Sequence, residues 1–437
     1  MICDCRAHSR YNGIFPDGLT GALLGLEGVA DAAVILHGPT GCRGHHSAMS
    51  EYAFPRGIVH ERLNYAERFY FGQPRIPTTY LNGDDFIFGA GEKLRQAILA
   101  VKARSPGLLA VVNAPGAALI GEDLRQCVAD SEIGVPGVVI EMPAFSRPMA
   151  EGYQQSILSV LEAIQPQRSP VRPRTVSLIG ISIAHNHWAG SLLELRRLLA
   201  LCGVEVLCVP GAGSPISAWH SLPRAACHAV IHTEYADRVA DWLRKRFDAP
   251  VIFPESGAPI GFEATEQWVV AVTEAVDADP AAALAVIREQ RRDVSRHLSR
   301  ISGIGGALKG MTCSIQADPS IALSLSRFLY HYLGILVVSA ATPNYANTGL
   351  AKRLKDFLSG IGCLDAWQVP WQMVGADFLF SDGHQVNQRL VSGCAEGGIE
   401  LVLPLCGRVD FVRKPLLGAE GAAYLVEAIV NNVPDYR

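Results

Sequence analysis

The stretch AAVILHGPTGC, residues 32–42, runs from an apolar segment into a tight turn with one cysteine at its tip. The apolar segment 32–36 is rich in strand-forming residues and predicts a β-strand. The Gly-Pro pair after His37 predicts a sharp turn at the end of that strand. No second cysteine lies two or three residues from Cys42, so this turn cannot form a local two-cysteine metal site.

The same alternation of apolar runs and helical stretches continues along the chain, which predicts an α/β fold with parallel sheets. Strands are expected at 32–38, 108–115, 137–145, 175–182, 204–210, 225–233, 249–254, 311–317, 335–342, 376–384 and 400–406. Helices are expected at 91–103, 150–164, 190–203, 235–247, 282–301, 319–334 and 420–432, with a Pro- and Arg-rich linker at 165–175. We therefore predict three doubly wound, Rossmann-like domains, 1–170, 171–300 and 301–437, with ligands at the carboxyl ends of their strands.

The composition narrows the class of protein. A chain of 437 residues is too long for one hydrophobic core, and 49% hydrophobic with 18% charged residues is a globular composition. A net charge of -4 gives no basic footprint for nucleic acid, and no apolar run reaches the roughly 20 residues of a membrane helix. The N-terminus MICDCRAHSR has no apolar signal core, which predicts a cytoplasmic protein. Its 11 cysteines are then expected to be buried thiols or metal ligands rather than disulfides.

The glycine-rich turns match no nucleotide motif. The chain has no GxxxxGK[ST] phosphate loop, and no expected strand is followed by a clean GxGxxG. Neither nucleotide hydrolysis nor nicotinamide chemistry on this chain has support.

Several motifs in a fixed order carry a resemblance to a known family. They are GALLGLEGVADAAVILHGPTGC (21–42), DDFIFGAGEKL (84–94), ALIGEDL (118–124) and IEMPAFSRPMAEGYQQSI (140–157). The second half adds GVEVLCVPGAGSPISAWHSLPRA (203–225), APIGFEATEQWV (258–269) and LVLPLCGRVDFVRKPLLGAEGAAYLVEAIVN (401–431). Over nearly its whole length the chain resembles the component 1 family of nitrogenase and its relatives.

The resemblance implies three α/β domains and assembly from paired subunits, as a homo- or hetero-dimer or tetramer. It also implies an iron–sulfur cluster, 4Fe–4S or P-cluster-like, shared between two subunits, and electrons delivered by an ATP-dependent iron protein. Cys42 would be one cluster ligand, because thiolates are the soft ligands that such clusters select. Gly41 would let the backbone approach the cluster and offer amide N–H groups to its sulfides. The alternative is that Cys42 is a buried thiol on a tight turn.

The chain departs from the family pattern at two positions. The family has a first cysteine about 25 residues before the one in the HGP turn, and here that position is Asp17. A carboxylate can bind iron, and the protochlorophyllide-reducing branch resembles this case, so Asp17 is a candidate ligand. One alternative is that Asp17 is an ordinary turn aspartate. Another is that Cys3 or Cys5 reaches the cluster instead. The third family cysteine falls at Ala114 or Pro115, which cannot bind metal, so a partner chain supplies more ligands or the cluster is smaller.

No catalytic residue is assigned from the sequence. Thr233 stands where the nitrogenase alpha subunit has a cofactor cysteine, which indicates a beta-type subunit. His384 follows an expected strand and is either a ligand or proton donor, or the cap of the next helix. His45 and His46 either donate hydrogen bonds to the cluster or substrate, or begin a helix.

Further polar residues have structural and functional interpretations. His185 and His187 line a cleft at a strand end, or begin a helix. Glu92, Glu122 and Asp123 are expected at helix N-termini, which favour negative charge. Asp84 and Asp85 are expected to precede a strand, where solvation or capping is the default expectation. The aromatic segment 63–89 is expected to contact a partner subunit or cover the cluster.

The leading hypothesis is a subunit of an ATP-dependent, two-component, nitrogenase-like reductase, with a methylthio-alkane as substrate. A tetrapyrrole reductase subunit is the nearest enzyme alternative, favoured by Asp17 and the cysteine-poor site. A scaffold for assembly of a nitrogenase cofactor is an alternative of a different class. A periplasmic-type sugar or ion binder is disfavoured by the missing signal peptide and by the HGPTGC turn.

Overall fold

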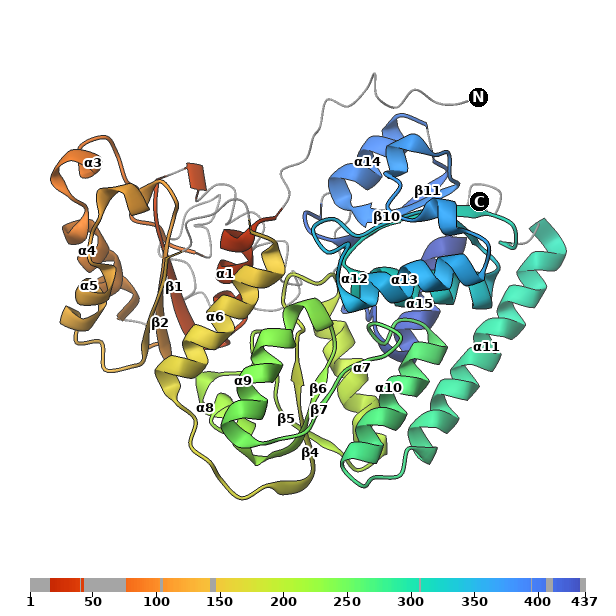
Figure 1. Ribbon diagram of the computed structural model, residues 1–437, viewed down its shortest axis with the longest axis horizontal. Helices are drawn as coiled ribbons and strands as arrows, with labels where there is room; N and C mark the ends of the chain where they lie inside the picture. The colour runs from red at the N-terminus through yellow and green to blue at the C-terminus, as the bar shows by residue number, and fades with distance from the viewer. Residues whose placement is uncertain are drawn as a thin grey trace.

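The computed structural model describes residues 16–39, 41–42, 76–102, 105–141, 147–305, 308–393, 395–405 and 412–432. Within these ranges the strands form three separate sheets, all with parallel pairing (Figure 1). This confirms the predicted α/β fold with parallel sheets.

Each sheet takes its strands from its own stretch of chain. The first has the order β1-β2-β3, from β1 (Ala32–His37), β2 (Leu108–Asn113) and β3 (Gly137–Glu141). The second has the order β5-β4-β6-β7, from β4 (Arg172–Ile179), β5 (Glu205–Cys208), β6 (Ala225–Val230) and β7 (Val251–Ile252). The third has the order β11-β10-β8-β9, from β8 (Thr312–Gln316), β9 (Leu336–Ala341), β10 (Phe378–Asp382) and β11 (Gly397–Val402).

The helices lie between the strands, as expected for doubly wound units. They are α1 (Gly18–Glu27), α3 (Asp85–Phe88), α4 (Gly91–Lys102), α5 (Leu124–Asp130), α6 (Met149–Ile164), α7 (Trp188–Leu201), α8 (Ile216–Trp219), α9 (Asp237–Phe247), α10 (Phe262–Ala275), α11 (Ala281–Gly305), α12 (Pro319–Phe328), α13 (Gly349–Gly360), α14 (Gly383–Val391) and α15 (Gly418–Val430). In the described part of the chain, no helix is both long and apolar enough to cross a membrane.

Three sequence expectations are corrected. Residues 86–88 form part of helix α3 instead of a strand, because Asn82 and Asp85 fold the chain locally through an Asn82 N–H···Oδ2 Asp85 bond of 2.6 Å. The expected linker is shorter, because β4 begins at Arg172. Helix 319–334 is α12 followed by one π-helical turn, Leu329–Leu333.

The first sheet is covered on both faces. Val34 and Leu36 point into the core formed with α1 and α6, whereas Ile35 and Val111 point into the core formed with α4 and α5. Figure 1 shows α4 and α5 on one side of β1 and β2, with α1 and α6 on the other. The buried strand β1 is therefore a fixed support for the turn that follows it.

The second and third sheets share one continuous hydrophobic core. The closing helix α15 packs on α7, α10 and α11. Glu194 of α7 caps α15, because its Oε1 accepts hydrogen bonds from Ala419 N (3.1 Å) and Glu420 N (3.2 Å). The two sheets are thus joined into one packed body.

Candidate functional site

The HGP turn is pinned on both sides at the carboxyl end of β1. Ala114 N donates to His37 O at 2.9 Å, and Gly38 N donates to Thr79 Oγ1 at 3.1 Å. A Cβ placed on Gly38 would lie 2.8 Å from Ala114 Cβ and 3.8 Å from Cys42 Cβ. Cys42 and Ala114, which occupy two of the positions where the resemblance puts cysteines, therefore lie within a few ångströms of the same glycine.

Cys42 and Asp17 are close enough to interact electrostatically. Cys42 is half-buried against the apolar core under α1 and α6. Burial raises the pKa of the Cys42 thiol, and the negative charge of Asp17 raises it further. A bound metal cation would instead lower the pKa of the Cys42 thiol, because it replaces the thiol proton and attracts the Asp17 carboxylate.

Asp17 also has a structural task, as the N-cap of α1. Its Oδ1 accepts hydrogen bonds from Thr20 N at 2.9 Å and from Thr20 Oγ1 at 3.0 Å. The ordinary-aspartate alternative is therefore a helix cap rather than a turn residue. Both contacts use Oδ1, so among the described residues the second carboxylate oxygen is left for another partner.

Gly41 faces open space in the described structure. A Cβ at this position would meet no atom of the described residues within 4 Å. Packing against the described residues therefore does not require glycine here.

The donor set on this chain fits an iron–sulfur cluster only in part. One thiolate (Cys42), one carboxylate (Asp17) and the open space at Gly41 suit a cluster edge. Within the described residues, no group of three or more His, Cys, Asp or Glu side chains gathers as a metal site. A cluster at this corner therefore needs ligands from elsewhere. Cys3, Cys5, His45 and His46 lie outside the described residues.

An exposed apolar patch lies next to this corner. Ile87 and Phe88 of α3 are 74% and 83% exposed, and Leu119 in the short 3-10 helix η3 (Ala117–Ile120) is 86% exposed. The two elements are in contact, and η3 begins three residues after Ala114. We call Ile87, Phe88 and Leu119 the α3 patch; such an exposed apolar cluster is typical of a binding surface.

The acidic motif residues hold the α3 patch in place. Glu122 Oε1 accepts hydrogen bonds from Ala90 N (2.6 Å) and Gly91 N (2.7 Å), so Glu122 caps α4 rather than its own helix. Asp123 caps α5 through Gln126 N at 2.9 Å. Asp85 is buried and forms an ion pair with Lys93 at 2.6 Å, where the sequence suggested solvation or capping.

Some histidines near the second and third sheets have a clear structural role, and others do not. His187 begins α7 with a positive φ of 58° and lies 3.1 Å from the hydroxyl of Tyr424, so it is a helix start. His384 is the second residue of α14 and is not its cap, because Asp382 accepts from Gln385 N. His185 is buried beside His232, which directly precedes Thr233.

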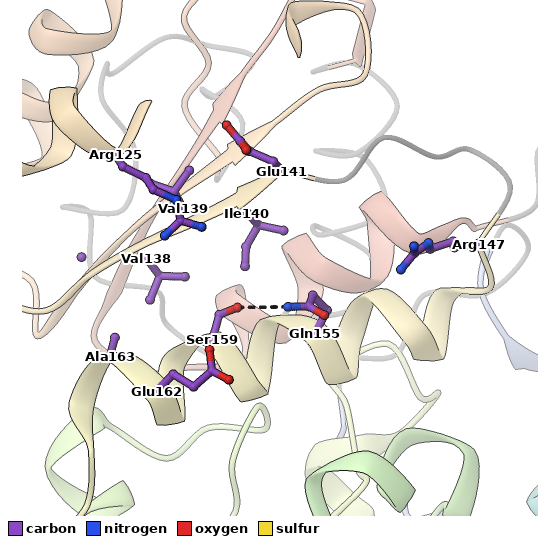
Figure 2. Close-up of a pocket in the computed structure, with 11 residues that line it drawn as sticks. Arg125, Val138, Val139, Ile140, Glu141, Arg147, Gln155, Ser159, Glu162 and Ala163 are labelled. Atoms are coloured by element: carbon purple, nitrogen blue, oxygen red, sulfur yellow. Dashed lines mark hydrogen bonds between the residues drawn. The ribbon is translucent and has the colours of Figure 1, made fainter. Parts of the chain in front are cut away.

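A separate groove of about 550 Å³ runs beside the free edge of β3 (Figure 2). Arg125, Glu141 and Arg147 lie on its walls, and Gln155 Nε2 donates to Ser159 Oγ at 3.4 Å on α6. The described residues that line it include no cysteine or histidine. These walls therefore offer iron no soft ligand, and the groove is distinct from the Cys42 corner.

His37 is a site residue that sequence reasoning missed. This side chain is fully buried, and neither of its ring nitrogens has a hydrogen-bond partner among the described residues. Burial lowers the pKa of His37, while Glu122 and Asp85 oppose that shift. The His37 side chain therefore links the HGP turn electrostatically to the two carboxylates that order the α3 patch.

Comparisons with known proteins match the chain over nearly its whole length. A family model described as "Nitrogenase component 1 type Oxidoreductase" matches residues 18–433. The nitrogenase molybdenum-iron protein beta chain of Methanococcus maripaludis is 23% identical over 463 aligned positions, covering 95% of this chain and 92% of that protein. One of the subunits of the light-independent protochlorophyllide reductase of Synechococcus sp. (strain CC9311) is 27% identical over 285, covering 62% and 53%. The solved structure "Nitrogenase Cp1 at pH 6.5" shares the fold, with a TM-score of 0.75 at 17% identity over 98% of this chain and 93% of that one.

Proposed function

The chain belongs to the nitrogenase component 1 type oxidoreductase family, and from this premise we propose that it is a subunit of an ATP-dependent two-component reductase. It would pair with a second component 1 subunit, identical or different, and accept electrons from a separate iron protein. The proposal includes the three domains 1–170, 171–300 and 301–437 and a cytoplasmic location. The observation that carries it is that Cys42, with the open space at Gly41 beside it, follows the end of β1 within electrostatic range of Asp17.

Cys42 and Asp17 would hold one edge of an iron–sulfur cluster, 4Fe–4S or P-cluster-like, with the other ligands from the partner subunit. When bound, such a cluster relays single electrons. The chain's own residues prepare its place: β1 fixes the turn, Gly41 leaves space, and the Asp17 cap ties the corner to α1. Pinning the ligands before the cluster arrives lowers the ordering cost of binding it.

The α3 patch supports a docked electron donor. Its three exposed apolar side chains, Ile87, Phe88 and Leu119, lie beside the corner on elements ordered by Glu122 and Lys93. A preformed apolar surface near a redox site suits a transient protein partner. The iron protein is the partner that the proposed function requires at this place.

For the substrate we propose a methylthio-alkane, cleaved at a carbon–sulfur bond. The carboxylate at Asp17 in place of a cysteine favours the tetrapyrrole-reducing branch as the second candidate. A scaffold for cofactor assembly would share the corner but would not turn over substrate. Steady substrate reduction by the iron-loaded complex separates an enzyme from such a scaffold.

Iron analysis tests the central claim. After anaerobic co-production with its partner chains, the wild type is expected to hold iron and sulfide. Cys42→Ala should lose them, whereas Cys127→Ala, which removes another half-buried thiol in α5, should keep them. Asp17→Asn tests the carboxylate charge separately from the helix cap, because asparagine keeps a good N-cap but loses the charge. An iron-free wild type, or full iron in Cys42→Ala, would overturn the proposal.

The docking claim has its own test. Phe88→Ser should lower the rate of reduction driven by the iron protein by about tenfold, the loss of roughly 1.4 kcal/mol of interface contact. Val391→Ser changes a residue that is 85% exposed on α14, far along the chain, and should have no effect. Reduction by a small chemical reductant should stay unchanged in both variants. An unchanged rate for Phe88→Ser with the iron protein removes the α3 patch from the proposal.

A further inference from the structure

A buried polar network joins the carboxyl ends of β6 and β8 and includes neither Cys42 nor Asp17. Glu234 lies in the 3-10 helix η5 (Thr233–Tyr235) that follows β6, and Asp318 precedes α12 after β8. Glu234 follows a strand of the second sheet and Asp318 follows a strand of the third, so the pair spans the junction of the two. Ligands of parallel α/β folds bind at such strand ends.

Hydrogen bonds connect Glu234 to a histidine through a serine. Ser320 Oγ donates to Glu234 Oε1 at 2.6 Å and lies 2.8 Å from His232 Nδ1. Either ring tautomer of His232 fits its contact with Ser320. His232, Ser320 and Glu234 therefore form an unbroken chain of hydrogen-bonding groups along which a proton can pass.

His232 stacks on a second neutral imidazole. The ring centroids of His185 and His232 are 3.9 Å apart, with planes inclined by 16°. His185 Nδ1 accepts from Ser182 N at 2.9 Å, so Nε2 carries the hydrogen, and this buried Nε2 has no partner in the described part of the chain. Burial lowers the pKa of His185 to about 3 and that of His232 well below its usual value. Neither ring supplies a positive charge to the nearby carboxyls.

The two carboxyls have no cationic partner among the described residues. Burial raises the pKa of Glu234 to about 8, with the charge of Asp318 as the next cause, and burial raises the pKa of Asp318 to about 6. The other groups facing them are the hydroxyls of Ser320, Tyr235 and Tyr345. Two carboxyls in such surroundings hold one proton between them at neutral pH and titrate as a pair.

Asp318 connects this pair to a cavity of about 90 Å³. The wall includes Tyr235, Tyr345 and Asp382, and the first sheet contributes Pro16 and Met149. Pro16 directly precedes Asp17, and Asp17 forms a β-bridge with Pro148. The cavity therefore lies where the three sheets meet and adjoins the segment that bears the candidate iron ligand.

We propose that Glu234 and Asp318 form an acid pair that donates a proton to a small molecule held in this cavity. Asp318 touches the cavity and is the catalytic residue, whereas Glu234 acts through it as a positioning residue that retains the shared proton. The inference rests on the proposed reductase function. In that reaction a thioether acceptor gains two electrons, delivered singly from the iron protein, and two protons, delivered in turn by the pair, so that its carbon–sulfur bond breaks to give a hydrocarbon and a thiol. At each proton transfer the carboxyl O–H bond breaks, a bond from hydrogen to the acceptor forms, and solvent water returns the proton.

The cavity suits a small acceptor. A molecule of a few heavy atoms with a proton-accepting atom fits its volume of about 90 Å³. Such a substrate is consistent with the proposed thioether chemistry.

Infrared titration of the full-length protein tests the pair without any enzyme activity. The wild type should show a protonated-carboxyl band that disappears with a midpoint near pH 8 and shifts in D₂O. Glu234→Gln should lack this band near pH 8, because burial raises the pKa of the remaining Asp318 only to about 6. Glu194→Gln, which changes another buried glutamate that is ion-paired to Arg197 at 2.7 Å, should keep it. A wild type without the band, or Glu234→Gln with it, would overturn the acid pair.

Kinetics of the iron-loaded complex tests the proton donation. The wild-type rate should fall as the pair loses its proton above about pH 8. Asp318→Asn should lower kcat about 100-fold at unchanged iron content. Glu234→Gln should move the alkaline fall to lower pH, because Asp318, whose pKa burial raises to about 6, then titrates alone; Glu234→Asp should restore the wild-type profile in part. Wild-type pH dependence in an iron-replete Glu234→Gln would refute the proton role and leave the reductase standing. An iron-free wild type would refute the reductase, while the infrared result would still decide on the pair.

Discussion

The contact between α1 and α6 gives a prediction whose size follows from the coordinates. A Cβ on Gly152 of α6 would lie 1.7 Å from the carbonyl oxygen of Gly18, and one on Gly21 of α1 would lie 1.9 Å from Met149 O. The atoms met are backbone atoms, which cannot turn aside as a side chain would. Gly152→Ala must therefore push the two helices apart by more than an ångström.

The expected cost exceeds the gain in helix preference. Overpacking of a core typically costs about 1–3 kcal/mol, and a backbone clash belongs at the upper end of that range. Alanine returns about 1 kcal/mol relative to glycine inside a helix. The net loss for Gly152→Ala is about 2 kcal/mol, which chemical denaturation followed by circular dichroism can measure.

The control uses the same substitution in an open place. Gly360 is the last residue of α13, and a Cβ there would meet nothing within 4 Å. Gly360→Ala should be neutral or slightly stabilising. Gly152→Ala should also lower the iron content, because Gly18 follows Asp17 and moves with it. A Gly152→Ala protein as stable as the wild type would refute the close packing of α1 on α6.

Two further predictions concern carboxylates with different tasks. Glu122→Ala leaves Ala90 N and Gly91 N without their acceptor, so faster amide hydrogen exchange is expected at the start of α4, with a loss of about 1–3 kcal/mol; unchanged exchange would show that Glu122 is not the cap. For Glu234, the pKa rises from 4.5 to about 8 on folding, so the folded state binds the proton more tightly and stability falls as pH rises between these values. Glu234→Gln should remove this slope, so the variant should gain stability relative to wild type at pH 9 but much less at pH 5. The gain in free energy of unfolding is up to about 5 kcal/mol, and it is measured as a higher melting temperature. Equal differences at both pH values would contradict the raised pKa.

The strands could be predicted from the sequence because they are buried on both faces. The apolar runs 108–115 and 335–342 became β2 and β9 with small boundary changes. Helix α1 was missed, because its two internal glycines, Gly21 and Gly25, disfavour a helix in isolation. They are accommodated by close packing on α6, which is a tertiary effect that no local pattern reports.

The candidate site, like the fold, could be predicted from the sequence only in part. Cys42 and Asp17 could be singled out because the family pattern fixes their spacing, although the structure was needed to place the two charges within reach. Glu234 and Asp318 could not be paired from sequence, since they lie on different sheets and far apart in the chain. The one local signal was the polar group HTEY, 232–235, directly after a buried strand, where ligand-binding residues gather in parallel sheets.

The positions of the two centres constrain how the subunit can work. Pro16 lies on the cavity wall and Asp17 caps α1, so one short segment borders both the proton source and the proposed iron ligand. In the proposed reaction, an electron added without a proton would leave an added charge beside the buried Asp318, at a high desolvation cost. A proton from the acid pair would avoid that charge. The Asp17→Asn variant therefore should impair the electron side while leaving the infrared band of Glu234 unchanged, because the acid pair takes its hydrogen bonds from Ser320 and Tyr235 and none from Asp17.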